Sequence, residues 1–133
     1  MDSKIQPPVS SGKLWGGRIM SWLPALFMLV DGVMKLFKPA VVVEGTVKLG
    51  YTENVIVPLG IVLTVCTVIY LIPRTAVLGA VVLTGYLGGA TATHLRVQDP
   101  TFVVPVVVGV IIWTGLYLRE GRLGSFLSTP EKA

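Results

Sequence analysis

Residues Ile19-Met-Ser-Trp-Leu-Pro-Ala-Leu-Phe-Met-Leu-Val-Asp-Gly-Val-Met-Lys-Leu-Phe-Lys38 decide the fold class of this chain. The segment is mostly apolar and has the length of about 20 residues with which a helix crosses a bilayer. Asp31 and Lys35 lie inside it, one helical turn apart. An ionisable group at the centre of such a helix costs roughly 2.5–3.5 kcal/mol on insertion scales, so it usually faces the interior of a helix bundle. This turn is therefore the first candidate for a functional site.

The composition of the whole chain is typical of an integral membrane protein. Of the 133 residues, 53% are hydrophobic and 14% are charged, whereas soluble domains carry about 25% charged residues. The mean hydropathy is +0.77, and the length allows one domain. The net charge of +4 comes from basic residues that flank apolar runs. Basic residues in such flanks set topology and contact lipid headgroups, so we expect a lipid bilayer and no nucleic acid as partner.

Three further apolar runs have the length of a membrane span, at 54–72, 75–95 and 101–118. Their continuous apolar character favours helices over the alternating strands of a membrane β-barrel, although valine and isoleucine are frequent. The connections that join these runs to one another are short and predict antiparallel neighbours. We therefore expect an all-α fold, an integral membrane up-and-down four-helix bundle.

The connection at 39–53 is the long one, and it predicts a short amphipathic helix lying on the mouth of the bundle. It begins with a proline and carries Gly50 where a helix would end. The membrane domain, at 18–120, is expected to follow a flexible tail at 1–17 and to precede a cytoplasmic tail at 121–133. No small-residue cleavage site follows the first apolar run, so we interpret this run as a retained span and not as a signal peptide.

Basic residues are distributed unevenly between the two ends of the predicted bundle. Seven lie with the two termini and the turn at 73–74, namely Lys4, Lys13, Arg18, Arg74, Arg119, Arg122 and Lys132, and four lie at the other end, namely Lys35, Lys38, Lys48 and Arg96. The positive-inside rule therefore predicts that both termini are cytoplasmic. The aromatic side chains expected to form a belt near the cytoplasmic face are Trp15, Trp22, Tyr70, Trp113 and Tyr117.

This topology brings the charged turn of the first span to the same side as the end of the third span. Met28, Asp31 and Lys35 share a face of the first helix, and the spacing of Thr84, Thr91 and His94 likewise places them on one face of the third. Two half-polar faces predict one polar pocket on the outer side, with the connecting segment at its mouth. The candidate ligand-binding residues are Asp31, Lys35, His94, Thr91, Glu44 and Arg96.

Structural explanations for the same residues stay open. Asp31 and Lys35 form an i,i+4 acid-base pair and could neutralise each other inside the bundle. His94, near a helix end, could be an interfacial hydrogen-bonding residue. Arg96 and Asp99 could do no more than cap the tight turn before the fourth span.

The third span also contains Gly85-Tyr-Leu-Gly-Gly89, a Gly-x-x-x-Gly pattern that permits close helix approach. Gly85, Gly88 and Gly89 are therefore predicted packing positions. The contact could lie within the bundle or between subunits of a homo-oligomer, and we favour the bundle.

Several kinds of site are not supported by the sequence. One histidine without a partnering ligand pair argues against a protein metal site, and the single cysteine, Cys66, has no internal disulfide partner. The motifs of a nucleophile elbow, a phosphate-binding loop and a dinucleotide fold are missing, which argues against a conventional hydrolase or kinase. Redox chemistry would need a bound cofactor, which the sequence does not identify.

Four segments together resemble the DoxX-like family of small bacterial membrane proteins. They are Phe27-Met-Leu-Val-Asp-Gly-Val-Met-Lys-Leu-Phe37, Leu49-Gly-Tyr51, Pro73-Arg74 and Gly85-Tyr-Leu-Gly-Gly-Ala-Thr-Ala-Thr-His-Leu-Arg96. The resemblance covers roughly residues 20–118 and implies a four-helix bundle in the bacterial inner membrane. The positions that match the family pattern are Gly32, Lys35, Gly88, Gly89, Ala90 and His94, whereas Asp31 is not assumed to be shared.

The resemblance implies two classes of function. The wider superfamily includes proteins linked to thiosulfate:quinone oxidoreduction or to membrane oxidoreductase complexes, which suggests a redox-associated protein that binds a quinone or similar ligand in the outer-side pocket. In that case Lys35 and His94 would donate hydrogen bonds to a carbonyl oxygen, and Asp31 or His94 would exchange the proton. Other relatives assist the folding or trafficking of membrane proteins, which suggests a non-enzymatic scaffold for a partner membrane or redox protein. Solute transport is a weaker alternative, because four short spans enclose little space.

Overall fold

The computed structural model describes residues 10–121 and 123. Four helices of this part are long and apolar enough to cross a membrane. They are α1 (Ser11–Phe37), α3 (Ile56–Leu71), α4 (Ala76–Arg96) and α5 (Val103–Arg119). The predicted all-α, four-helix fold is thereby confirmed.

The long helices form an up-and-down bundle in which α1 packs against α3 and α5, and α4 packs against the same two helices. Short 3₁₀ turns lead into the last three of them, namely η1 (Glu53–Val55), η2 (Pro73–Thr75) and η3 (Pro100–Phe102). Proline suits the first position of η2 and η3, because a backbone N–H at this position has no acceptor within the helix and proline has none to satisfy. The predicted short connections are therefore one-turn reversals.

Helix α1 begins earlier than the sequence predicts. The side chain of Ser10 accepts a hydrogen bond from the backbone N–H of Lys13 and caps the helix, which starts at Ser11. The prediction of a flexible tail at 1–17 is therefore wrong for residues 11–17, which are helical. The glycines that suggested a tail fit the helix, because Gly17 lies against α5, where an added Cβ would lie 2.8 Å from the carbonyl oxygen of Gly115. Residues 1–9, 122 and 124–133 of the predicted tails lie outside the described residues.

Glycines mark the places where the long helices come closest. At the crossing of α1 and α3, a Cβ on Gly60 would lie 2.7 Å from the carbonyl oxygen of Gly32. At the crossing of α3 and α4, a Cβ on Gly79 would collide with the backbone of Tyr70. Small residues at such crossings let helix backbones approach, which is how membrane helices gain packing energy without a hydrophobic driving force.

Tyr70 is a core residue and not part of the predicted aromatic belt. Its side chain is fully buried between the helices. Its hydroxyl donates to the carbonyl oxygen of Ile112 at 2.9 Å and lies 3.0 Å from Oγ of Ser21, while the guanidinium of Arg119 lies 5.2 Å from the ring centroid. One phenol therefore connects α3 with both α1 and α5 at the end of the bundle where α1 begins and α5 ends.

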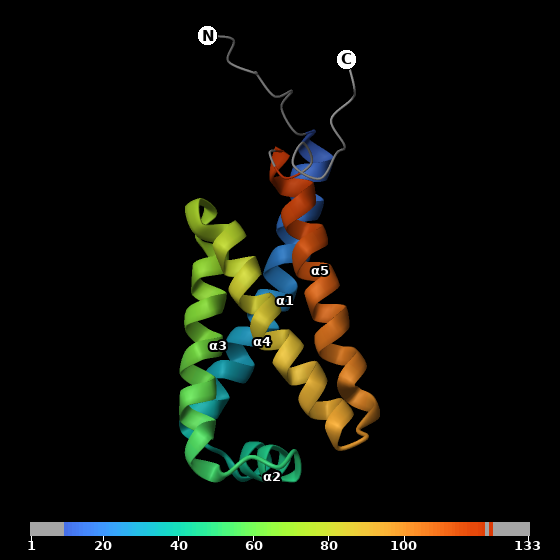
Figure 1. The fold of residues 1–133 in the computed structure, drawn as a ribbon. Helices are drawn as coiled ribbons and strands as arrows, with labels where there is room; N and C mark the ends of the chain where they lie inside the picture. The colour runs from blue at the N-terminus through green and yellow to red at the C-terminus, as the bar shows by residue number, and fades with distance from the viewer. Residues whose placement is uncertain (1–9, 122, 124–133) are drawn as a thin grey trace.

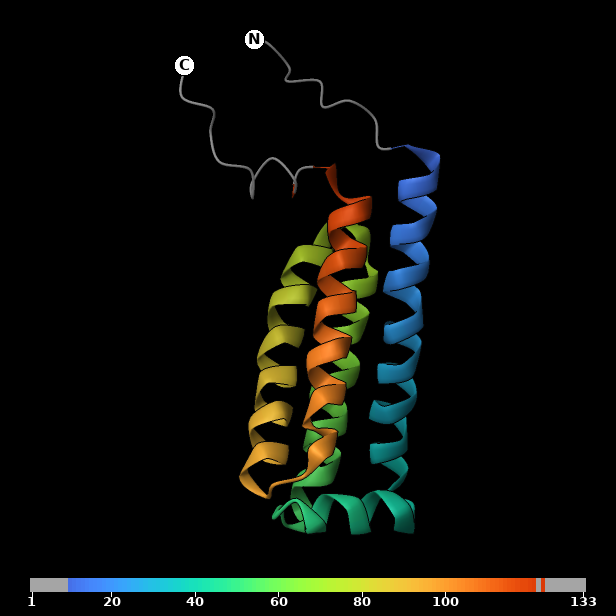
Figure 2. The same cartoon turned by 90° about the vertical axis from the view of Figure 1, so that its right-hand side faces the viewer.

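The helices separate toward the opposite end, and a short helix lies across the opening. Figure 1 shows α4 leaving α3 as it runs toward this end, and in Figure 2 α2 (Ala40–Lys48) crosses the ends of the long helices. The short helix predicted at 39–53 is confirmed. It follows a sharp reversal at Lys38, whose φ is 52°. The ammonium of Lys38 then pairs with Glu53 at 3.2 Å and joins the two ends of the connection.

Candidate functional site

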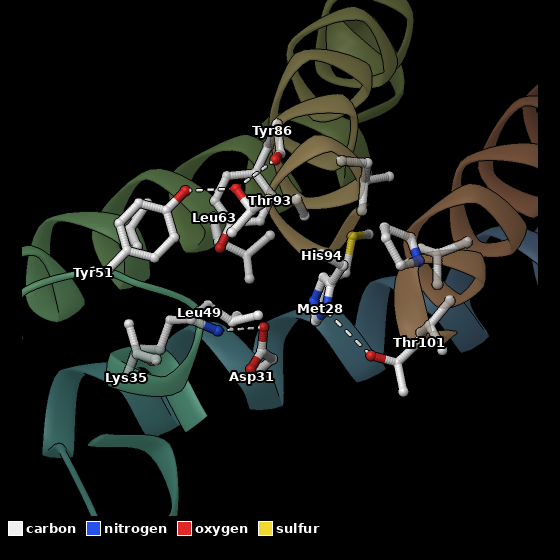
Figure 3. A pocket seen from close by; sticks show the side chains of 18 of the residues that line it. Met28, Asp31, Lys35, Leu49, Tyr51, Leu63, Tyr86, Thr93, His94 and Thr101 are labelled. Carbon is white, nitrogen blue, oxygen red and sulfur yellow. Dashed lines mark hydrogen bonds and ion pairs between the residues drawn. The ribbon is translucent and has the colours of Figure 1, made fainter. Parts of the chain in front are cut away.

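A cavity of about 490 Å³ lies between the long helices at the end covered by α2. This volume falls within the range of about 300–1,000 Å³ typical of small-molecule sites. Much of its wall is apolar, with Met28, Leu59, Leu63, Leu87 and Val108. Polar side chains also line it, as Figure 3 shows, and include Asp31, Lys35, Tyr51, Tyr86, Thr93 and His94. The predicted polar pocket therefore exists in the described part of the chain.

Asp31 and Lys35 form an ion pair on the cavity wall. Nζ of Lys35 lies 2.6 Å from Oδ2 of Asp31, one helical turn away on α1. The lysine side chain is 13% exposed and the aspartate side chain is 43% exposed, so the ammonium is the more buried partner. An ammonium has three N–H donors, and the pair occupies one of them. The structural explanation and the ligand-binding explanation are thus compatible, because the pair itself faces the cavity.

His94 is oriented by the turn that follows α4. Its Nδ1 lies 3.2 Å from Oδ2 of Asp99 and 3.1 Å from Oγ1 of Thr101. The hydroxyl of Thr101 donates to Oδ1 of Asp99 at 2.8 Å, so its single proton is used there. We assign Nδ1 as the protonated nitrogen, because a carboxylate and an occupied hydroxyl oxygen can only accept. In the neutral ring Nε2 is then a proton acceptor, and the described residues provide no hydrogen-bond partner for it.

Asp99 keeps its charge in this turn. The backbone N–H of Thr101, the Thr101 hydroxyl and the His94 ring hold the pKa of the Asp99 carboxyl below its ordinary value of 3.8. The carboxylate therefore stays ionised at neutral pH, where it can orient the imidazole of His94. The capping role proposed for Asp99 and the site role of His94 belong to one hydrogen-bonded cluster.

The segment after α2 is fastened to α4 beside the cavity. The hydroxyl of Thr93 donates to the carbonyl oxygen of Gly89 at 2.8 Å, so the hydroxyl of Tyr51, also at 2.8 Å, donates to Thr93. The guanidinium of Arg96 donates to the carbonyl oxygen of Leu49 at 2.6 Å. These two contacts hold the connecting segment over the mouth of the cavity.

Gly50 fits between these two contacts for a conformational and a steric reason. Its φ is +93°, a conformation that side chains rarely adopt, and an added Cβ would lie 2.6 Å from the guanidinium of Arg96. The Leu49-Gly-Tyr51 motif of the sequence thus provides the contacts that hold the connecting segment on α4.

The six predicted site residues do not all meet. Asp31, Lys35 and His94 line the cavity, whereas Thr91, Glu44 and Arg96 are not among the described residues that line it. The hydroxyl of Thr91 donates to the carbonyl oxygen of Leu87 within its own helix, and Glu44 is exposed on α2.

Polar residues that the sequence reasoning missed complete the cavity wall. The cavity side of α4 runs through Tyr86, Ala90 and Thr93, so Thr93 takes the place expected for Thr91. Tyr51 had a signal in the sequence, because it ends the Leu49-Gly-Tyr51 motif. Tyr86 had a signal as well, since it lies inside the Gly-x-x-x-Gly pattern.

The three glycines of the third span do not pack closely within the bundle. A Cβ added to Gly85, Gly88 or Gly89 would have nothing within 4 Å among the described residues. Gly85 and Gly89 instead line the cavity. The favoured prediction, close packing within the bundle, is therefore wrong, and a contact between subunits stays a prediction. Close approaches between helices occur instead at other glycines, such as Gly32, Gly60 and Gly79, which are not part of a Gly-x-x-x-Gly pattern.

Comparison with known proteins identifies the family of this chain. The model of the DoxX-like family matches residues 19–115, a range that contains the cavity and all of its lining residues. No curated protein and no solved structure matches the chain significantly. Within the described residues there is also no group of three or more His, Cys, Asp or Glu side chains that could hold a metal ion.

Proposed function

Since the chain belongs to the DoxX-like family of membrane proteins, we propose that it binds a quinone or a similar small amphiphile in the cavity beneath α2 and takes part in membrane redox chemistry. One observation carries the proposal: hydrogen-bonding groups from α1, α4 and the connecting segment line one cavity together with many apolar side chains. A ligand with a polar head and an apolar body matches this combination.

Lys35 is the proposed anchor of the polar head. Its ammonium is held by Asp31 and keeps N–H donors toward the cavity. A quinone carbonyl oxygen is an acceptor, and a hydrogen bond to a charged donor contributes roughly 1.5–3 kcal/mol. The phenols of Tyr51 and Tyr86 line the same cavity. The hydroxyl of Tyr86 can donate to the ligand, whereas that of Tyr51, which donates to Thr93, can accept.

His94 is the proposed proton-exchanging group. Reduction of a quinone to a quinol takes two electrons and two protons, and the unpaired Nε2 of His94 is placed to pass a proton in either direction. Asp99 stabilises the imidazolium whenever the ring carries both protons. The electrons would come from a partner membrane oxidoreductase, so the chain's own role is to bind the ligand and move protons.

Binding of a quinone to the protein in lipid nanodiscs tests this proposal. The probe is a dimethoxy-methyl benzoquinone without a tail, and the variants are Lys35→Ala and His94→Ala. We expect Lys35→Ala to weaken binding by about tenfold or more, which corresponds to about 1.4 kcal/mol. His94→Ala should weaken binding to the extent that the doubly protonated ring donates from Nε2 to a quinone oxygen. Lys48→Ala is the matched control for the loss of a basic residue, because Lys48 is exposed on α2 outside the cavity. Wild-type affinity in both cavity variants, or no binding by the wild-type protein, would refute the proposal.

A second candidate function is that of a scaffold for a partner membrane protein. The observation in its favour is Gly88, which is exposed on α4 outside the cavity and has nothing within 4 Å of an added Cβ among the described residues. A flat helix surface of this kind accepts a neighbouring helix. Gly88→Leu would then abolish a partner complex or a homo-oligomer in native mass spectrometry. An unchanged complex in this variant would count against the scaffold function.

A further inference from the structure

Helices α3 and α4 pack closely where α3 ends and α4 begins, and they diverge toward the end that carries α2. Near the start of α4, Gly79 packs directly on the backbone of Tyr70. Farther along, Gly85 and Gly89 have no neighbour within 4 Å of an added Cβ among the described residues. Figure 1 shows the same divergence, with α4 moving away from α3 toward the end that carries α2. Beyond their crossing the two helices therefore diverge, and the space between them, called the gap below, is lined by residues of both.

This gap is continuous with the cavity. Gly85 and Gly89 line the cavity and are also exposed. On the α3 side Leu59 and Leu63 line the same space. Residues that line the cavity and are also exposed mark where it opens, and on α4 two of them have no side chain.

The opposite side of the bundle also has exposed lining residues, but its chemistry is different. Phe27 of α1 is 58% exposed and lines the cavity, and Asp31, on the same part of α1, is 43% exposed. A carboxylate facing hydrocarbon is costly, so this side suits the polar part of a ligand. The gap between α3 and α4 has leucine and glycine at its border and suits a hydrocarbon chain.

We infer that the ligand is a membrane-borne amphiphile whose hydrocarbon tail leaves the cavity laterally between α3 and α4, across Gly85 and Gly89. This inference rests on the proposed function and narrows its ligand to tailed molecules that arrive from the bilayer. The polar head lies at Lys35 and His94. The connecting segment, held by Tyr51 and Arg96, covers the end of the bundle, so the side gap is a route along which a tail stays in hydrocarbon.

A comparison of two probes with the same head tests the inference. One is the benzoquinone without a tail, and the other carries a decyl tail. Both are titrated against the full chain in nanodiscs, with Gly85→Leu, Gly89→Leu and the matched control Gly88→Leu. Each affinity is expressed relative to the wild-type protein for the same probe, so that partitioning of the tail into lipid cancels.

We expect Gly85→Leu and Gly89→Leu to weaken binding of the decyl probe at least tenfold and binding of the tailless probe less than twofold. Gly88→Leu adds the same bulk to the same helix outside the cavity and should leave both affinities within twofold. Gly89→Ala, which adds one methyl group, should give a smaller loss of the same kind. If a leucine variant does not fold, the affinities of Gly89→Ala for the two probes test the inference in its place.

The alternative outcomes separate this inference from the proposed function. Unchanged binding of the decyl probe in both glycine variants would overturn the lateral route, even if Lys35→Ala and His94→Ala still weaken both probes. Equal losses for the two probes would also overturn it, because the added side chains would then obstruct the head site and not the tail. Failure of Lys35→Ala and His94→Ala to affect either probe would instead refute the proposed function.

Discussion

The ammonium of Lys35 lies 2.6 Å from the carboxylate of Asp31, and the lysine is the more buried of the two, with 13% of its side chain exposed against 43% for the aspartate. Lysine usually reaches toward the polar boundary with its long side chain while a shorter acid stays behind. Here the acid has the more open position, and the lysine is enclosed in the cavity wall. The two residues are therefore not equivalent, and their removal should not have equal effects.

Asp31→Asn should destabilise the protein more than Lys35→Met. The first change leaves a buried ammonium without its counter-charge, and an unsatisfied buried charged group costs at least about 1–3 kcal/mol. The second leaves a half-exposed carboxylate that can find water or a headgroup. Unfolding in mild detergent, followed by circular dichroism, measures both. The double variant should recover part of the loss, because it removes both charges. Equal destabilisation by the two single changes would contradict the asymmetry.

Gly60→Ala should destabilise the crossing of α1 and α3 by about 1–3 kcal/mol, the usual cost of overpacking. The added Cβ would lie 2.7 Å from the carbonyl oxygen of Gly32 and 2.8 Å from Cβ of Lys35. Gly16→Ala is the matched control, since an added Cβ there has nothing within 4 Å among the described residues. In the control, alanine should stabilise the helix by about 0.5–1 kcal/mol through its better helix propensity. The two variants should therefore change the free energy of unfolding in opposite directions, a decrease for Gly60→Ala and an increase for Gly16→Ala.

The fold was predictable because hydropathy, proline and glycine act locally. Apolar runs of membrane length located α3, α4 and α5 to within a few residues, and Pro39 with Gly50 delimited α2. The start of α1 was missed because the glycines of residues 11–17 suggest a tail, although they lie within a capped helix.

The site was predictable only in part, for a geometric reason. Spacing fixes which residues share a face of one helix, but it does not fix how that helix is rotated toward its neighbours. His94 was placed correctly on the basis of its end of the bundle, whereas Thr93 lines the cavity where Thr91 was expected. The same limit applies to Gly85 and Gly89, because a small residue permits either a close contact or an opening. Only the position of α3 decides between them.

The cap formed by Asp99 should make stability depend on acid pH. Hydrogen bonds from Thr101 and His94 hold the pKa of Asp99 below its ordinary value of 3.8. A lowered folded-state pKa means that the ionised group stabilises the fold above the unfolded-state pKa, and that this contribution is lost as the pH falls through the folded-state value. Asp99→Asn should therefore remove part of the loss of stability seen between neutral and acid pH. Thermal unfolding across this range measures the difference, with Glu44→Gln, on exposed α2, as the control. Parallel pH profiles for wild-type and Asp99→Asn proteins would contradict the role of this cap.

Tyr51→Phe should loosen the cover of the cavity without unfolding the bundle. The change removes the hydroxyl that donates to Oγ1 of Thr93 at 2.8 Å and keeps the ring. A single hydrogen bond contributes about 0.5–1.5 kcal/mol, so local opening of residues 49–53 should become roughly 2- to 12-fold more frequent. Hydrogen exchange measured by mass spectrometry should then be faster in this segment and unchanged in α3 and α5. Thr93→Val should have the same effect, because it removes the acceptor of the same bond. If neither variant accelerates exchange, the contact between Tyr51 and Thr93 does not hold the connecting segment in place, and the guanidinium of Arg96, 2.6 Å from the carbonyl oxygen of Leu49, would be the contact that does.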